Sequence, residues 1–76
     1  MKIVVTGGAG FIGTNTCEDL IENGHHVICL DNFLTGKREN VEALLSSKRF
    51  ELVEGDIRDL ETCRKAVKGA DLVLHL

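Results

Sequence analysis

Thr6-Gly7-Gly8-Ala9-Gly10-Phe11-Ile12-Gly13 is the stretch that decides the fold of this chain. It follows the apolar, β-branched run Ile3–Val5 and opens a helix-like pattern that stops at Gly24. Such a glycine-rich turn between a strand and a helix needs a residue that can reverse the chain. Gly7 or Gly8 can do this, because glycine adopts backbone conformations that side chains forbid.

The other glycines of this stretch suit the close approach of a ligand. Gly10 lets the backbone come near a phosphate group, and Gly13 lets the new helix pack tightly on the preceding strand. The N–H groups around Phe11 and Ile12, at the helix N-terminus, then point at the anion with the helix dipole behind them. The stretch therefore predicts a pyrophosphate-binding loop.

Three nearby glycines are weak evidence alone, since this chain has 8 glycines. The context strengthens the prediction. A second apolar run, His26–Leu30, leads into Asp31, and a ribose-binding acid is expected at the C-terminal end of the second strand, roughly 20 residues after the glycines. The alternative is that Asp31 is a turn residue. Strand, loop, helix, strand and acid in this order predict dinucleotide binding.

Length and composition set the bounds. A chain of 76 residues makes one domain at most, and it buries only about 60% of its unfolded surface, so its stability is marginal. It is 43% hydrophobic and 28% charged, as in globular proteins. The net charge of −3 and the isolated pairs Lys37-Arg38 and Lys48-Arg49 argue against a nucleic-acid partner. No run resembles a membrane span or signal peptide, so we expect a cytoplasmic protein without a membrane partner.

Cysteine and histidine are given structural interpretations. Cys17, Cys29 and Cys63 each fall within an apolar pattern and predict small buried side chains in a reducing compartment. His25 and His26 lie between a helix end and a strand, with no cysteine or carboxylate at ligand spacing. We therefore expect no metal site.

Apolar periodicity predicts alternating strands and helices. The expected strands are Lys2–Thr6, His26–Leu30, Phe50–Glu54 and Asp71–Leu76. The expected helices are Phe11–Glu22, Asn40–Ser46 and a third that Asp59 caps and Gly69 ends. The residues expected on the buried faces of the first and third helices are Ile12, Thr16, Leu20 and Ile21, and Leu60, Cys63, Ala66 and Val67.

This alternation predicts an α/β fold with right-handed crossovers. The expected architecture is a Rossmann-like, doubly wound parallel sheet with strand order 3-2-1-4, in three layers. The loops that follow the strands then lie at one edge of the sheet, and a crevice opens between the first and fourth strands. No linker or internal repeat is visible, so residues 1–76 are expected to form part of a single domain.

Four segments together resemble a known family: residues 6–13, 31–36, 55–59 and 72–76. They look like the N-terminal part of the extended short-chain dehydrogenase/reductase family. Within it, the chain is most similar to the NAD-dependent nucleotide-sugar epimerases and dehydratases, with UDP-sugar 4-epimerases the closest subgroup. The resemblance covers the whole chain.

The resemblance implies NAD as cofactor. Phe11 and Ile12 would donate backbone N–H groups to the pyrophosphate, and Asp31 would accept hydrogen bonds from the adenosine ribose. The charge of Asp31 would also repel a 2′-phosphate, which favours NAD over NADP. The residues implied to wrap the edge of the ribose are Asn32, Phe33, Leu34, Thr35 and Gly36.

The resemblance also implies an adenine site. Asp56 would face the adenine amino group, and the Ile57 N–H group would face an adenine ring nitrogen, because an acceptor beside a donor complements that edge. Leu76 would lie beside the cofactor at the end of the fourth strand. The alternatives are that Asp56 caps its loop and that Leu76 is a plain core residue.

The sequence departs from the family pattern in two ways. Thr14-Asn15 stands where a Ser-His pair is common, which we interpret as a small change in helix packing. The chain also has no tyrosine, whereas family members carry a catalytic Ser or Thr and a Tyr-x-x-x-Lys pair further along. Residues 1–76 therefore contain none of the catalytic residues, and this segment alone is expected to be inactive, as a piece of a longer protein.

For that longer protein the resemblance implies a nucleotide-sugar substrate, a homodimer and 4-epimerisation through transient hydride transfer to NAD. Three alternatives stay open at this point. In the first, the protein is a dehydratase or decarboxylase of the same family. In the second, it is a non-enzymatic module that senses NAD. In the third, the segment has no function of its own and presents a bare apolar strand edge.

Overall fold

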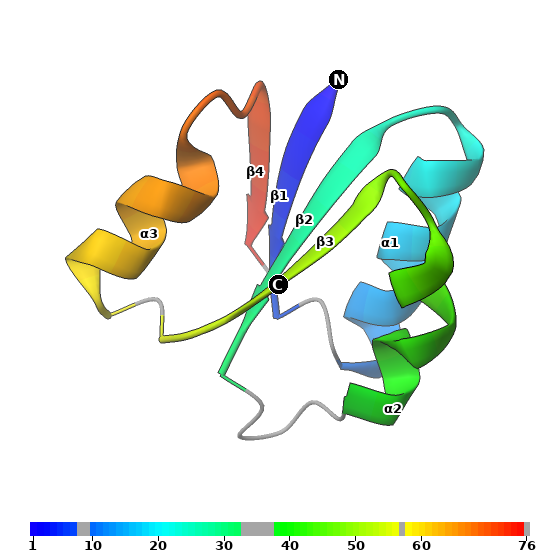
Figure 1. Cartoon of the computed structure of the whole chain (residues 1–76), viewed down its shortest axis with the longest axis horizontal. Coiled ribbons are helices and arrows are strands. Elements are labelled where there is room, and N and C mark those ends of the chain that lie inside the picture. Colours follow the sequence, from blue (N-terminus) through cyan, green and yellow to red (C-terminus); the bar gives the residue numbers. More distant parts are fainter. Residues whose placement is uncertain (8–9, 33–37, 57, 76) are drawn as a thin grey trace.

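A computed structural model of the chain describes residues 1–7, 10–32, 38–56 and 58–75 (Figure 1). The strands within these residues are β1 (Lys2–Thr6), β2 (His26–Asp31), β3 (Phe50–Glu54) and β4 (Leu72–His75). The helices are α1 (Phe11–Glu22), α2 (Arg38–Val41), the 3-10 turn η1 (Glu42–Ser46) and α3 (Leu60–Val67). No helix of the described part has the length and apolar character needed to cross a membrane.

The strands form one parallel sheet in the order β3-β2-β1-β4, which confirms the predicted topology. In the register of the sheet, Thr6 lies opposite Leu30 on one side and His75 on the other. Asp31, the last residue of β2, lies opposite Glu54. Because all strands run the same way, their C-terminal ends meet at one edge, the lower one in Figure 1.

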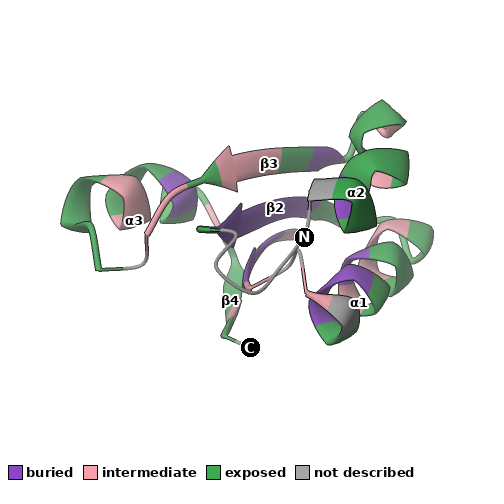
Figure 2. Ribbon diagram, turned by 90° about the horizontal axis from the view of Figure 1, so that it is seen from below, coloured by how far each residue is buried: buried purple, intermediate pink, exposed green. Residues whose placement is uncertain are grey.

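Helices cover both faces of the sheet, so the fold has three layers (Figure 2). Ile3 and Val5 belong to a buried cluster that includes residues of α1 and α2. Val4, with the opposite side-chain direction, packs in a second cluster with Ala66 of α3. A strand buried on both faces needs apolar residues without polar alternation, which explains the Ile-Val-Val run of β1.

Helix α1 begins and ends as predicted, but its buried face differs. It ends in a Schellman motif, in which Gly24 has φ of 86° and the N–H groups of Gly24 and His25 donate to carbonyls of the last turn. Ile12 is 71% exposed, so its predicted burial is wrong. Gly13 and Cys17 are buried instead, and Cys17 packs in the same cluster as Val5.

The second helix also differs from the prediction. The segment expected to be one helix over residues 40–46 is a short α-helix from Arg38 that continues as the 3-10 turn η1. The Ser46 hydroxyl donates to the Ala43 carbonyl, and the Ser47 N–H group donates to the Leu44 carbonyl. Both are bonds to the third preceding residue, which tighten the last turn into 3-10 geometry.

The third helix buries fewer of its residues than predicted, and the fourth strand begins one residue later. In α3, Ala66 is buried and Cys63 packs partly against the same cluster, whereas Leu60 and Val67 are exposed. Strand β4 begins at Leu72 rather than at residue 71. Asp71 instead binds the start of β1, since its carboxylate accepts a hydrogen bond of 2.8 Å from the Lys2 N–H group.

The cysteines confirm the structural interpretation at two of three positions. Cys17 and Cys29 are buried in the cluster beneath α1, while Cys63 is partly exposed. A hydrogen bond with the Cys29 side chain lowers the pKa of the Cys17 thiol, against the opposing effect of burial. The two sulfur atoms thus fill the space between α1 and β2.

Candidate functional site

The turn after β1 is made by Gly7. Its φ of 72° lies in the left-handed region that favours glycine. The Gly7 N–H group donates to the Leu30 carbonyl at 2.9 Å, and the Gly7 carbonyl accepts from the Gly10 N–H group at 3.2 Å. Sequence reasoning left Gly7 and Gly8 as alternatives; Gly8 lies outside the described residues. The loop is therefore anchored to β2 where it leaves the sheet.

Within the described residues, neither backbone conformation nor a close contact requires glycine at position 10. Its φ of −76° and ψ of 173° suit any residue. A Cβ atom built on Gly10 meets the Gly7 carbonyl oxygen at 3.6 Å, an ordinary contact, and nothing nearer among the described atoms. Among the described residues, then, little crowds this position where α1 begins, and a phosphate group needs such room to reach the backbone.

The start of α1 supplies donors at this space. Gly10 is the N-cap residue and gives no side-chain cap. Intrahelical bonding begins with Thr14, whose N–H group and hydroxyl donate to the Gly10 carbonyl at 2.8 and 2.7 Å. The N–H groups of Phe11, Ile12 and Gly13 therefore precede the first helical carbonyl that could accept them. Helix geometry points them outward, with the positive end of the dipole.

Asp31 lies within β2 and not in a turn, which removes the alternative that it is a turn residue. It is 7% exposed. Its carbonyl accepts a hydrogen bond of 3.0 Å from the Gly55 N–H group, which joins the ends of β2 and β3. Glu54 is its register partner, and laterally paired residues of a parallel sheet project to the same face. Asn32 follows directly and is exposed.

Asp56 is bound by Arg58, a residue that sequence reasoning gave no role. The guanidinium Nη2 of Arg58 lies 2.6 Å from Asp56 Oδ2, and Nε lies 3.1 and 3.0 Å from the two oxygens. The Arg58 N–H group donates to Asp56 Oδ1 at 2.8 Å. These bonds hold the pKa of Asp56 down at about 2. Asp56 thus does cap its own loop, and no sequence pattern sets its side-chain pair with Arg58.

Replacing Arg58 with alanine should raise the pKa of Asp56. The guanidinium bond is the largest cause of the low value, and the backbone bond that remains keeps the pKa below the ordinary value of about 3.9. Carbon-detected NMR titration of the Asp56 carboxyl group between pH 1.5 and 6 measures both values. Arg64→Ala, which removes an exposed arginine of α3, is the control and should leave the pKa at about 2.

The low pKa of Asp56 also makes the stability of the fold depend on pH. A depressed pKa stabilises the fold fully above the unfolded value of about 3.9 and loses this contribution as the pH falls toward about 2. Arg58→Ala should therefore flatten the acid limb of the stability curve in that window. Equal Asp56 titration in the parent and in Arg58→Ala would show that the ion pair does not form in solution.

Gly55 lets α3 approach the end of β3. A Cβ atom at this position would lie 2.5 Å from Thr62 Cγ2, a branched side chain within a helix. Gly55→Ala should lower the free energy of unfolding by about 1–3 kcal/mol through this overlap. Adding Thr62→Ser, which removes that methyl group, should restore most of the loss. Urea unfolding of the single and double variants measures the rescue, and its absence would place the cause elsewhere.

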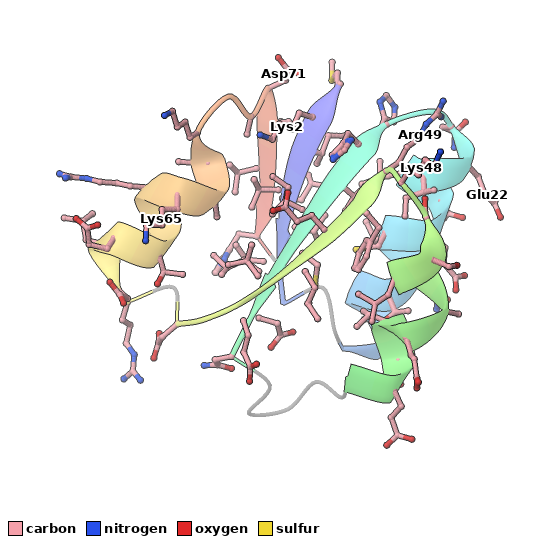
Figure 3. The ribbon with its side chains drawn as sticks, viewed as in Figure 1. Lys2, Glu22, Lys48, Arg49, Lys65 and Asp71 are labelled. Atoms are coloured by element: carbon pink, nitrogen blue, oxygen red, sulfur yellow. The ribbon has the colours of Figure 1, made fainter. Side chains whose placement is uncertain are left out.

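These positions gather at one edge of the sheet. Gly7 follows β1, Asp31 ends β2 and Gly55 follows β3, so these positions span about 10 Å across the sheet. The charged residues Lys2, Lys48, Arg49 and Asp71 lie at the opposite end, where the strands begin (Figure 3). The predicted site residues outside the described part of the chain are Phe33, Leu34, Thr35, Gly36, Ile57 and Leu76.

Known proteins are similar to this chain in sequence and in structure. UDP-glucuronic acid decarboxylase 1 of Arabidopsis thaliana is 51% identical over 57 residues, which is 75% of this chain and 13% of that protein. The crystal structure of UDP-glucose 4-epimerase from Thermotoga maritima with UDP-glucose is 40% identical, with a TM-score of 0.86 over 100% of this chain and 24% of that one.

A third relative is the dTDP-glucose 4,6-dehydratase of Bacillus anthracis, crystallised in complex with NAD. It is 28% identical, with a TM-score of 0.90 over 100% of this chain and 26% of that one. The chain thus spans about a quarter or less of the length of these relatives. The model of the NAD dependent epimerase/dehydratase family matches residues 3–76. The chain therefore belongs to the NAD-dependent epimerase/dehydratase family.

Proposed function

We propose that this chain forms the adenosine and pyrophosphate side of an NAD site. The observation that carries the proposal is Gly10. Nothing in the described part of the chain requires glycine there, and a Cβ atom at this position at the start of α1 would make only an ordinary contact with a described atom, the Gly7 carbonyl oxygen. A bound pyrophosphate supplies the missing reason, since its oxygens must reach the backbone N–H groups of Phe11 and Ile12.

The other roles follow from position. Gly7 turns the chain toward the ligand, and Gly13 keeps α1 close to the sheet. Asp31, at the end of the neighbouring strand, accepts hydrogen bonds from the ribose hydroxyls, with Asn32 at its edge. The roles of Phe33, Leu34, Thr35, Gly36, Ile57 and Leu76 stay predictions from the family resemblance.

Asp56 can serve adenine while Arg58 holds it. A carboxylate has about four acceptor positions, and three Arg58 N–H groups, those of the backbone, Nε and Nη2, bind the two Asp56 oxygens. A position remains for the adenine amino group. The ion pair then fixes the direction of the carboxylate, so that binding does not have to order it.

For the whole protein we propose 4-epimerisation of a UDP-linked hexose. In this reaction bound NAD accepts a hydride from the sugar and returns it. Support comes from the likeness to the Thermotoga maritima epimerase over the entire chain. Residues 1–76 contain no tyrosine, so the acid–base residues of the family belong to the rest of the protein. We further propose, from the resemblance alone, that the whole protein is a homodimer.

Decarboxylation of a UDP-linked uronic acid is the second candidate. The observation that favours it is the higher identity, 51%, to the Arabidopsis thaliana decarboxylase over 57 residues. Both candidates begin with oxidation of the sugar by NAD, and this chain would serve both in the same way. The choice between them is therefore made by residues beyond this segment.

A substrate panel separates the candidates. The whole protein with NAD would be incubated with UDP-glucose, UDP-glucuronic acid and dTDP-glucose, and the products followed by proton NMR. We expect UDP-glucose and UDP-galactose to interconvert. Loss of carbon dioxide from UDP-glucuronic acid would identify a decarboxylase, and loss of water from dTDP-glucose a dehydratase. Tight NAD binding without turnover of any of the three would favour a sensing module.

A further inference from the structure

We propose that His75 and Thr6 form a positioning pair that sets the direction of the pyrophosphate loop from the β4 side. The proposal rests on the proposed function and deepens it. Thr6 is the last residue of β1, directly before the turn at Gly7, and His75 is the last residue of β4. The pair therefore lies between β1 and β4, at the point where the strand order reverses.

The contact between these side chains is short. His75 Nδ1 lies 2.7 Å from Thr6 Oγ1, and Thr6 Oγ1 lies 3.4 Å from the Leu74 carbonyl oxygen. The hydroxyl has a single proton. It either donates to the Leu74 carbonyl and accepts from the imidazole N–H group, or it donates to Nδ1. Both arrangements fix the Thr6 side chain between β1 and β4.

The pair lies where it can constrain the loop after β1 as well as the pairing of β1 with β4. Backbone pairing already joins β1 to β4 from Ile3 to Thr6, so the side-chain bond adds its constraint at the last rung. On the other side of the same turn, the Gly7 N–H group binds the Leu30 carbonyl of β2 at 2.9 Å. The loop thus leaves the sheet held by β2 through backbone and by β4 through His75.

The side chains also differ in exposure in a way that suits positioning. Thr6 is buried, whereas His75 is exposed at the end of β4. Without the imidazole, the contact that the Thr6 hydroxyl keeps within the described residues is the longer one to Leu74, and its rotamer is less constrained. Motion of Thr6 passes to Gly7 and from there to the N–H groups that bind phosphate. The groups proposed to bind adenosine lie elsewhere, on β2 and after β3, so we expect them to keep their positions.

This difference gives a specific test, with ADP and adenosine as the two probes. Thr6→Val and His75→Phe remove the bond, Thr6→Ser keeps the hydroxyl, and His75→Asn places an amide near the position of Nδ1. Affinities are measured by NMR chemical-shift titration. We expect Thr6→Val and His75→Phe each to weaken ADP binding about 3- to 10-fold, with adenosine binding unchanged. The double variant should be no worse than either single one.

Asp71→Ala is the matched control. It removes the hydrogen bond of 2.8 Å that the Lys2 N–H group of β1 donates to the residue directly before β4, so it loosens the start of β4 without touching the loop. It should leave ADP affinity unchanged, and Thr6→Ser and His75→Asn should stay near the parent. Equal losses for ADP and adenosine, or a loss of ADP affinity in Asp71→Ala, would overturn the proposal and leave a purely structural role.

The outcomes for the two proposals are distinct. If the parent chain binds neither ADP nor NAD, the proposed function fails and this inference falls with it. If the parent binds both and the Thr6 and His75 variants bind ADP as the parent does, only the inference fails. Circular dichroism at the titration temperature verifies that each compared variant is folded.

Discussion

Replacing Gly10 with alanine is expected to weaken NAD binding roughly 10- to 100-fold while the chain stays folded. The added methyl group meets only the Gly7 carbonyl oxygen at 3.6 Å within the described structure, so the fold accommodates it. Alanine is a poorer N-cap than glycine, which limits the loss of stability to about 1 kcal/mol or less. The methyl group instead occupies the space that a pyrophosphate oxygen requires. Isothermal titration calorimetry measures the affinity, and urea unfolding measures the stability.

Gly7→Ala is the matched control for this experiment. This variant adds the same methyl group in the same loop, but at a residue with φ of 72°. Alanine in the left-handed region costs about 1–2 kcal/mol, so Gly7→Ala should lose stability, whereas Gly10→Ala should lose affinity. A Gly10→Ala variant that binds NAD as tightly as the parent would contradict the assignment of this loop to pyrophosphate.

Removing the Asp31 carboxylate is expected to produce the second large effect. Asp31→Ala and the closer mimic Asp31→Asn should weaken NAD binding about 10- to 100-fold, the range for hydrogen bonds to a charged group. NADP affinity should fall less or rise, because the charge that repels a 2′-phosphate is gone. The preference for NAD over NADP should therefore narrow. Titration of each variant with both cofactors gives the ratio.

Glu54→Gln is the control for Asp31. Glu54 is the register partner of Asp31 and carries the same charge at the same sheet edge, but it has no assigned contact with ribose. Its neutralisation should change the NAD/NADP ratio less than Asp31→Asn does. If Glu54→Gln narrows the ratio as much, the discrimination comes from the general negative charge of the edge. If neither changes it, the ribose assignment of Asp31 is wrong.

Local sequence patterns were sufficient to predict the topology. Each of three patterns predicts the local structure around it: the apolar run of β1, the glycines after it, and the acid at the end of β2. The sheet order then follows from how βαβ units connect. Helix faces were predicted less well, as Ile12 and Leu60 show. Periodicity assigns one face to a whole helix, whereas α1 and α3 contact the sheet only along part of their lengths.

Two contacts at the candidate site could not be predicted from patterns. The Asp56–Arg58 pair depends on the rotamers of exposed side chains in a turn, and spacing alone does not set those. The Thr6–His75 bond joins residues that are 69 positions apart, and it requires the exact register of β1 against β4. Predicting such a contact requires the tertiary structure, because a shift of one residue in register sends the side chain to the other face of the sheet.

The most direct test of the central claim is an amide NMR titration of the isotope-labelled chain with NAD. We predict saturable shifts that are largest for the N–H groups of Phe11, Ile12 and Gly13, with a second group at Asp31 and Asp56. Residues at the opposite end of the sheet, such as Lys2 and Asp71, should not move. Unchanged amide positions at the start of α1 under saturating NAD would contradict the claim that this loop binds the pyrophosphate.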